Sequence, residues 1–232
     1  MPRDIGRKLA AVAERLQARF RQGAWHQRRD ALAELIYTVL SQNTSDVNSL
    51  RAERSLRQHF ASWDEIEMAS AEEIADAIKM GGLANVKAPR IKALLAALRE
   101  REGHLGLDHL AHLDMQNALD YLTQFEGVGP KTASCVLLFG LGRPAFPVDT
   151  HVFRVATRLG WLAPKTSLES AHRQLLAMIP EGMRYQLHLN LISHGRRVCK
   201  ARGPDCANCI LADLCPSAGL VADTPKRRAG AQ

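Results

Sequence analysis

Apolar side chains recur every three to four residues along most of the 232-residue chain, and this spacing is the strongest constraint on its fold. One stripe contains Leu9, Val12 and Leu16, and another runs from Ile91 to Leu98. The sequence has no sustained alternation of apolar and polar residues and no Asn-Gly or Asp-Gly turn. The pattern therefore predicts an all-α protein of about ten short helices, with helices over residues 131–140, 150–160, 167–179 and 182–194 among them.

Several helix starts are marked by capping residues. Asp30 precedes an apolar stripe and is a candidate N-cap. A capping box pairs a hydroxyl with a carboxylate three residues later, and each side chain accepts a hydrogen bond from a backbone amide. Three pairs have this spacing: Ser62 with Glu65, Ser70 with Glu73, and Thr166 with Glu169.

Composition excludes several classes of protein. Hydrophobic residues make up 46% and charged residues 24% of the chain, which is typical of a globular domain with a buried core. This rules out a disordered chain, a collagen-like repeat and a disulfide miniprotein. The longest apolar runs, such as residues 133–141, are too short to cross a bilayer, and the first ten residues show no secretory signal. We therefore expect a cytoplasmic protein that does not bind membranes.

The balance of charge favours a polyanionic partner such as nucleic acid. The chain has 31 Lys and Arg residues against 24 Asp and Glu residues, which gives a formal net charge of +7. Basic residues concentrate in segments 1–30 and 181–205, whereas acidic residues dominate segment 53–77. A separation into a basic and an acidic surface would suit DNA binding, although each run alone is also compatible with a solvated helix face.

Four of the five cysteines form a cluster near the end of the sequence, with the spacing C-x6-C-x2-C-x5-C. Clustered thiols without a secretory signal favour a metal site over disulfides. The spacing leaves zinc and a [4Fe–4S] cluster equally open. Either group could staple a short segment and present the neighbouring Lys200 and Arg202 to phosphates. The fifth cysteine, Cys135, is expected to be a small buried hydrophobe. The cluster residues are Cys199, Cys206, Cys209 and Cys215.

A glycine-rich turn joins two predicted helices at Gly127-Val128-Gly129. Both glycines are expected to allow positive φ, and Pro130 suits the first position of the following helix. Such a hairpin exposes backbone amides at a helix N-terminus and could bind a phosphate without reading sequence. A simple helical turn is the alternative interpretation.

Two polar residues after this turn are candidates for catalysis. Lys131 falls in the first helical turn, where the helix dipole disfavours a structural cation and favours a neutral, nucleophilic amine. A lysine that contacts phosphate is equally compatible with the position. Asp149 precedes the apolar segment 150–160 and could be either an N-cap or a carboxylate facing a reacting sugar.

In combination these motifs resemble the endonuclease III family of helix-hairpin-helix DNA glycosylases. The resemblance rests on the ordered set of 127–133, 148–151 and the cysteine loop 199–215, and it covers about residues 31–215. It includes Leu40-Ser-Gln-Asn-Thr44 and Gly82-Leu-Ala-Asn-Val-Lys87. Each motif is moderately specific, whereas the ordered set is highly specific.

The resemblance implies a two-lobed all-α fold with a DNA cleft between the lobes. A six-helix barrel lobe with the hairpin would span residues 25–143. Residues 1–24 and 144–216 would form a second helical lobe, which carries a [4Fe–4S] loop. Residues 217–232 contain few apolar side chains and are expected to form a flexible tail. We expect a monomer.

The resemblance also implies a bifunctional DNA glycosylase and AP lyase of base excision repair, acting on oxidised pyrimidines in damaged double-stranded DNA. The damaged base would be flipped out of the stack. Lys131 would attack C1′ and the resulting Schiff base would permit β-elimination, while Asp149 would activate the amine. Asn43 and Leu83 would fill the space left by the flipped base, and the pocket would be lined by Ser41, Gln42 and His151.

Two alternatives remain open. One is a related glycosylase for mismatched or alkylated bases, although several such enzymes lack the lysine. The other is a non-catalytic helix-hairpin-helix DNA-binding protein, which would require neither Asp149 nor the cysteines. The chain also departs from the family at Glu126, where many relatives have proline, at Asn43, in a longer segment 103–114 and in a longer tail. These departures affect lesion range and opposite-base preference.

Overall fold

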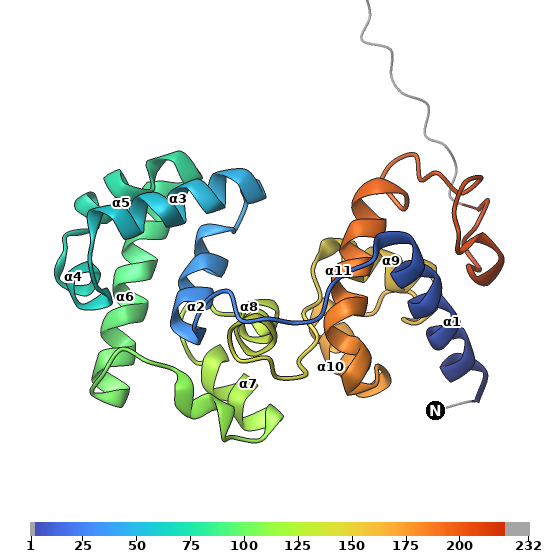
Figure 1. Cartoon of the computed structure of the whole chain (residues 1–232), viewed down its shortest axis with the longest axis horizontal. Coiled ribbons are helices and arrows are strands. Elements are labelled where there is room, and N and C mark those ends of the chain that lie inside the picture. Colours follow the sequence, from blue (N-terminus) through green and yellow to red (C-terminus); the bar gives the residue numbers. More distant parts are fainter. Residues whose placement is uncertain (1–2, 221–232) are drawn as a thin grey trace, which may run out of the picture. The chain divides into compact units, whose positions relative to one another are not determined.

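The computed structural model describes residues 3–220, and its regular elements are helices, with no strand in that part of the chain (Figure 1). This confirms the all-α prediction. None of the helices between residues 3 and 220 combines the length and apolar character of a membrane span. Most of the expected tail, residues 221–232, lies outside the described residues.

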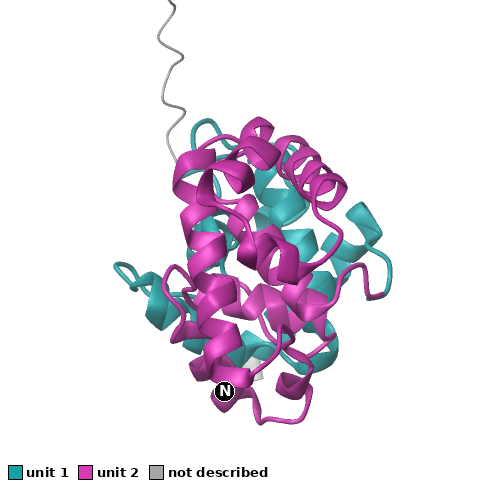
Figure 2. Ribbon diagram, turned by 90° about the vertical axis from the view of Figure 1, so that its left-hand side faces the viewer, with its two compact units in different colours: residues 1–25, 148–232 teal, residues 26–147 magenta. Residues whose placement is uncertain are grey.

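Two compact units divide the chain (Figure 2). One unit joins residues 1–25 to the residues from 148 onward, and the other contains residues 26–147. The chain thus changes unit at 25/26 and 147/148, where the expected lobes had boundaries at 24/25 and 143/144.

The unit of residues 26–147 is built around one almost completely buried helix, α2 (Ala31–Leu40), because nine of its ten residues are buried. Asp30 caps this helix as predicted, since its carboxylate accepts a hydrogen bond from the Ala33 amide at 2.7 Å. The neighbouring elements of this unit are α3 (Asp46–His59), α4 (Trp63–Met68), α5 (Ala71–Ile78), η1 (Lys79–Gly81), α6 (Ala84–Glu102), η2 (Asp108–Ala111), α7 (Met115–Thr123), α8 (Pro130–Cys135) and η3 (Val136–Gly140).

The predicted helix 131–140 is divided into two types of helix. Residues 130–135 form the α-helix α8, and residues 136–140 form the π-helix η3. Gly140 ends η3 against the start of α2, where an added Cβ would lie 2.8 Å from the Cα of Ala31. Cys135 is 5% exposed at the end of α8, as expected of a buried hydrophobe. The segment 103–114 contains the short helix η2.

The second unit packs α1 (Arg3–Phe20) and α9 (Thr150–Arg158) against α11 (Glu181–Arg197). The predicted stripe of Leu9, Val12 and Leu16 is buried on α1. α9 and α11 approach closely at Gly195, where an added Cβ would lie 2.9 Å from the Cβ of His151. The remaining elements of this unit are α10 (Leu168–Met178) and η4 (Ala212–Leu214).

The capping predictions were correct at one box and incomplete or wrong at the others. Ser70 and Glu73 form the full box. Ser62 caps α4, but the Glu65 carboxylate accepts from the Ala61 amide instead of the Ser62 amide. At α10 the capping residue is Ser167, which accepts from the Ser170 amide at 3.1 Å. The hydroxyl of Thr166 instead donates to the Ala163 carbonyl at 2.7 Å, so the predicted pair with Glu169 does not form.

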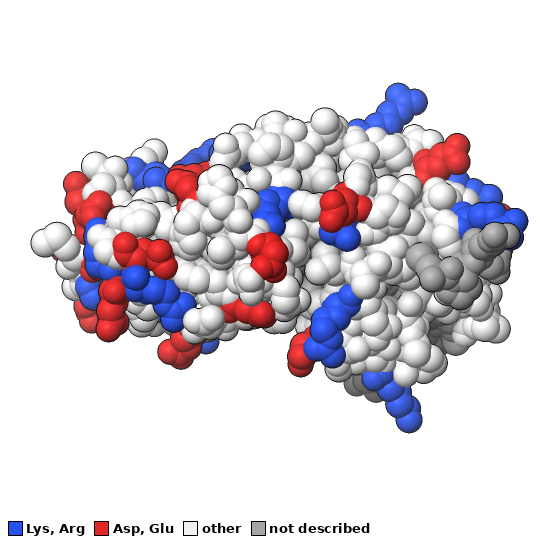
Figure 3. Space-filling view, turned by 90° about the horizontal axis from the view of Figure 1, so that it is seen from below, with Lys and Arg blue, Asp and Glu red and all other residues white. Residues whose placement is uncertain are grey.

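Some acidic side chains of the run 53–77 are paired with basic side chains. Arg99 pairs with both Asp64 and Glu67, and Arg29 pairs with Glu53. On the face shown in Figure 3, basic and acidic side chains are interspersed. Basic partners from distant parts of the sequence therefore neutralise some of the charges that appear clustered along the chain.

Candidate functional site

The glycine turn forms a tight connection between α7 and α8. Gly127 has φ +78°, which is the left-handed conformation predicted for it. Gly129 differs from the prediction, because it has φ −88° and ψ 178° and is the N-cap of α8. Pro130 takes the first helical position as expected. Val128 is buried, and its amide donates to the Phe125 carbonyl at 3.0 Å, which closes the turn.

Lys131 lies at the second residue of α8 and its side chain is partly exposed. The buried carboxylate of Glu34, on α2 of the same unit, lies within electrostatic range of Lys131. Burial raises the pKa of Glu34 to about 7, and the positive charges of Arg29 and Lys131 oppose that rise. Nη1 of Arg29 lies 3.4 Å from Oε2 of Glu34. The first turn of α8 therefore has a titratable acidic neighbour.

Glu34 had no role in the sequence-based prediction. Its signal in the sequence is a single acidic residue within an otherwise apolar helical segment, Ala31–Leu40. A buried carboxylate requires a partner. The sequence alone does not indicate that Arg29, five residues earlier, is the partner of Glu34. The fold supplies it by turning the Arg29 side chain back onto α2.

Asp149 caps α9, since its Oδ1 accepts a hydrogen bond from the Val152 amide at 2.7 Å. This confirms the structural interpretation of the residue. Lys131 belongs to one unit and Asp149 to the other, so their cooperation in catalysis stays a prediction.

The loop after α2 contains three of the predicted site residues. Ser41 is the C-cap of α2, and its hydroxyl donates to the Thr38 carbonyl at 2.8 Å. Oε1 of Gln42 lies 3.5 Å from Nη1 of Arg90 on α6. Asn43 is exposed and has φ +52°, a conformation that asparagine tolerates better than most residues.

Leu83 lies in a second loop of the same unit, directly before α6. Its side chain is 52% exposed and its φ is +55°. A large exposed apolar side chain with a left-handed backbone is unusual, because both exposure and conformation disfavour it. The exposed side chain is accessible at the surface, and its contact with DNA stays a prediction.

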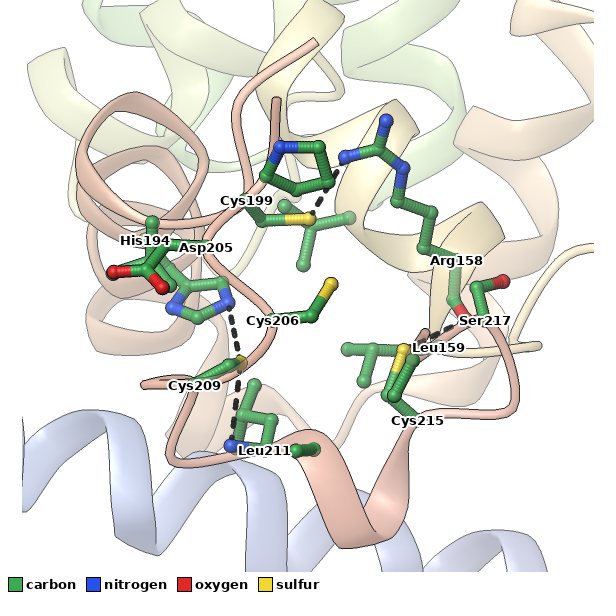
Figure 4. Close-up of a pocket in the computed structure, with 15 residues that line it drawn as sticks. Arg158, Leu159, His194, Cys199, Asp205, Cys206, Cys209, Leu211, Cys215 and Ser217 are labelled. Atoms are coloured by element: carbon green, nitrogen blue, oxygen red, sulfur yellow. Dashed lines mark hydrogen bonds between the residues drawn. The ribbon is translucent and has the colours of Figure 1, made fainter. Parts of the chain in front are cut away.

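The four clustered cysteines line a single pocket, and Figure 4 shows their sulfur atoms turned toward it. Among the described residues, no group of three or more His, Cys, Asp or Glu side chains is arranged so that it could hold a metal ion. Arginines from other elements hold the loop. Arg15 on α1 donates to the Ile210 carbonyl and pairs with Asp213, and Arg154 on α9 donates to the Cys199 carbonyl at 2.9 Å.

Hydrogen-bond donors contact two of the sulfur atoms, whereas burial raises the pKa of Cys209 and Cys215. Arg158 lies 3.2 Å from the sulfur of Cys199, and the Leu211 amide donates to the sulfur of Cys209 at 3.4 Å. Burial raises the pKa of Cys209, the Leu211 amide lowers it, and the charges of the other three cysteines raise it again. Four adjacent thiolates repel one another, so a cationic metal group would stabilise them together.

The remaining predicted residues lie around this second unit. Lys200 and Arg202 are exposed within the cysteine loop, where they are available to a polyanion. Nδ1 of His151 lies 3.0 Å from Nη2 of Arg154, and the ring packs beside Gly195 of α11. Within the described part of its own unit, His151 therefore has a packing role beside any role in the pocket.

Comparison with known proteins defines the class to which the chain belongs. Residues 36–181 match the model of the HhH-GPD superfamily of base excision DNA repair proteins. The chain is 35% identical over 190 residues to endonuclease III of Thermotoga maritima, covering 82% of this chain and 84% of that protein. It is also 35% identical over 189 residues to endonuclease III of Sulfolobus acidocaldarius, covering 81% and 82%. The chain belongs to the endonuclease III family within the HhH-GPD superfamily.

A longer relative and a solved structure extend this comparison. A candidate DNA glycosylase of Arabidopsis thaliana is 39% identical over 183 residues, which cover 79% of this chain and 60% of that protein. A structure of a trapped covalent intermediate of endonuclease III with DNA matches with a TM-score of 0.79 and 28% identity, covering 92% of this chain and 96% of that one. The fold is thus that of an enzyme seen bound to DNA.

Proposed function

We propose that this protein is a bifunctional DNA glycosylase and AP lyase that removes oxidised pyrimidines from duplex DNA. The observation that carries the proposal is Lys131, a partly exposed lysine at the start of the helix that follows the left-handed turn at Gly127. A lysine amine at this position can act as a nucleophile. Membership of the endonuclease III family supports the same chemistry.

The amine of Lys131 attacks C1′ of the damaged nucleotide. The bond from Nζ to C1′ forms as the glycosidic bond breaks, the base leaves with the bonding electrons, and Nζ loses a proton. Opening of the sugar ring gives an iminium ion, which makes the C2′ proton acidic. Removal of that proton drives cleavage of the C3′–O bond and cuts the strand.

The other residues bind and orient the substrate in this proposal. The carboxylate of Asp149 stabilises positive charge on the sugar and accepts the amine proton. The backbone of Gly127, Val128 and Gly129 contacts a phosphate. Asn43 and Leu83 enter the duplex at the flipped nucleotide, and the base pocket is lined by Ser41, Gln42 and His151.

The cysteine loop is proposed to hold a [4Fe–4S] cluster through Cys199, Cys206, Cys209 and Cys215, which line one pocket. When bound, the cluster cross-links residues 199–215 and compensates the charge of the four thiolates. The exposed Lys200 and Arg202 then contact DNA phosphates. We expect the protein in the compartment that contains the DNA, which in a bacterium is the cytoplasm.

A panel of duplex substrates tests the proposed function. The duplexes carry thymine glycol, uracil, 8-oxoguanine opposite adenine, or an abasic site. We expect excision of thymine glycol, strand cleavage at the abasic site, and a covalent adduct with abasic DNA in the presence of borohydride. Excision of uracil or of the mismatched adenine in preference to thymine glycol would instead support the mismatch enzymes, and binding without cleavage would support a non-catalytic module.

A further inference from the structure

The unit of residues 26–147 contains one fully buried lysine, Lys87 on α6, among its described residues. Its side chain is 2% exposed, and burial lowers its pKa. Its Nζ donates to the Leu40 carbonyl at 2.7 Å and to the Gly81 carbonyl at 3.3 Å. A buried ammonium group requires such partners, since an unpaired donor in the interior costs free energy. The lysine therefore links two segments that lie 47 and 6 residues away along the chain.

Each of the two carbonyl groups belongs to the residue directly before a loop. Leu40 is the last residue of α2 and precedes Ser41-Gln42-Asn43, and Gly81 ends η1 and precedes Gly82-Leu83. The two loops are adjacent, because an added Cβ at Gly82 would lie 4.0 Å from Oγ1 of Thr44. One ammonium group thus holds the points from which both loops leave the core.

The loops contain left-handed backbone that the surrounding structure must maintain. Asn43 has φ +52° and Leu83 has φ +55°, conformations that residues with a Cβ rarely adopt. Leu83 and the nearby side chains of Met80 and Val86 are exposed and apolar. The packing of Gly81 against α3 is also tight, since an added Cβ would lie 2.8 Å from the Cβ of Ala52.

We propose that Lys87 is a positioning residue that fixes the loops 41–44 and 81–83 relative to each other, so that Asn43 and Leu83 enter the duplex together. This inference rests on the proposed function for the DNA roles of those two residues. Lys87 does not itself reach the DNA, because its side chain is buried. Replacing Lys87 should therefore lower the excision rate most on substrates in which the enzyme must open a base pair, and least where the base is already unpaired.

Lys87→Met tests the proposal against a matched control on the same helix. Lys92 also joins two carbonyl groups, those of Glu67 and Ala69 at 2.7 and 2.6 Å, but these belong to the end of α4. Lys92→Met therefore removes a half-buried ammonium group that also has two carbonyl partners but lies away from the loops. Lys87→Gln, which keeps two N–H donors on a shorter side chain, replaces Lys87→Met if that variant does not fold.

Excision is measured on a paired lesion and on the same lesion in an unpaired bulge. For the Lys87 variant we expect the excision rate on the paired lesion to fall roughly tenfold to a hundredfold, because misplaced binding groups have effects of this size. On the bulged lesion the rate should fall less than about threefold. Borohydride trapping on an abasic site should persist. Amide hydrogen exchange should become faster in residues 41–44 and 81–83 in the Lys87 variant and remain unchanged there in Lys92→Met.

Three results would overturn the proposal. The Lys87 variant could lose as much excision rate on the bulged lesion as on the paired one, or Lys92→Met could lose as much on the paired lesion as the Lys87 variant does. The third is that amide exchange in both loops of the Lys87 variant is the same as in wild type. Failure of the wild-type protein to excise any lesion and to form a trapped adduct would instead contradict the proposed function. In that case the hydrogen-exchange comparison still decides whether Lys87 fixes the two loops.

Discussion

At the scale of single residues, the proposed chemistry depends on the amine of Lys131. Lys131→Ala should abolish the borohydride-trapped adduct and strand cleavage, while the affinity for DNA and the melting temperature change little, because the side chain is partly exposed. The exposed Lys165 provides a control, since Lys165→Ala should trap as wild type does. A trapped adduct of undiminished yield in Lys131→Ala would remove this lysine from the mechanism.

Asp149 has a structural and a proposed catalytic role, and two substitutions separate them. Asparagine is also a good N-cap, so Asp149→Asn should keep the stability of α9 while base excision falls roughly a hundredfold or more. Asp149→Ala should lose the cap as well, at about 1 kcal/mol of unfolding free energy. Excision rates and denaturant melts of both variants decide the matter. An active Asp149→Asn would leave the residue with the capping role alone.

The buried Glu34 should give a pH-dependent stability. Its pKa is about 7 in the folded protein, above the ordinary value of 4.5. Between these values the folded state keeps a proton that the unfolded state has lost, so this carboxyl makes the protein less stable as pH rises. Glu34→Gln lacks the effect, and its unfolding free energy relative to wild type should increase by roughly 2–3 kcal/mol from pH 5 to pH 8.

The control for this experiment is Glu73, whose pKa is lowered by the Ser70 backbone amide and hydroxyl. The ionised form of Glu73 is the one that stabilises the fold, so Glu73→Gln should lose stability relative to wild type as pH rises. Opposite pH trends for the two variants are the expected result in urea melts. A flat difference between Glu34→Gln and wild type would show that Glu34 titrates normally.

At the scale of elements, the hairpin between α7 and α8 contains two glycines with different requirements. Gly127→Ala should lower the unfolding free energy by about 1–2 kcal/mol, because a Cβ is strained at φ +78°. Gly129→Ala should lower it by less than Gly127→Ala does, since φ is −88° and an added Cβ meets nothing within 4 Å, so that only the poorer N-cap preference of alanine counts against it. Denaturant melts compare the two, and equal losses would contradict the described turn geometry.

Within each unit, two elements approach each other closely at a glycine. Gly140 of η3 lies against Ala31 of α2, and Gly195 of α11 lies against His151 of α9. In both places any larger residue would require one element to move away from the other. In one unit the contact holds η3, which follows the Lys131 helix α8, close to α2, and in the other it holds α9, which Asp149 caps, close to α11.

At the scale of the whole molecule, the cysteine loop should determine yield and DNA affinity. The purified protein should be yellow-brown and contain about four irons per chain. Cys206→Ser should lower soluble yield and weaken DNA binding, without changing the rate of excision by bound enzyme. Cys135→Ala is the control, because Cys135 is buried in the other unit and should leave the iron content unchanged.

The loss of affinity in Cys206→Ser should depend on salt, since Lys200 and Arg202 are expected to contact phosphates and release counterions. Titrations of DNA at several salt concentrations should give a shallower slope for the variant than for wild type. A colourless wild-type protein with one zinc per chain would show that the metal is wrongly assigned, while the enzyme assignment would stand.

The sequence by itself determined the features that arise from neighbours along the chain. Helical stripes, the cap at Asp30, the box at Ser70 and Glu73, and the left-handed Gly127 all depend on contacts within about four residues. The ordered motifs also identified the family, because spacing between motifs is a property of the chain. Local competition explains the errors: Ser167 capped α10 in place of Thr166, and Gly129 became an N-cap.

Only the tertiary structure decided the features that join residues distant in sequence. Arg99 pairs with Asp64 and Glu67, more than thirty residues away, so part of the charge of the acidic run is neutralised. Glu34 lies near Lys131 only because α2 and α8 pack together, and Lys87 reaches Leu40 across 47 residues. The pKa of a buried group and the partner of a buried charge depend on distance in space, which the order of residues does not specify.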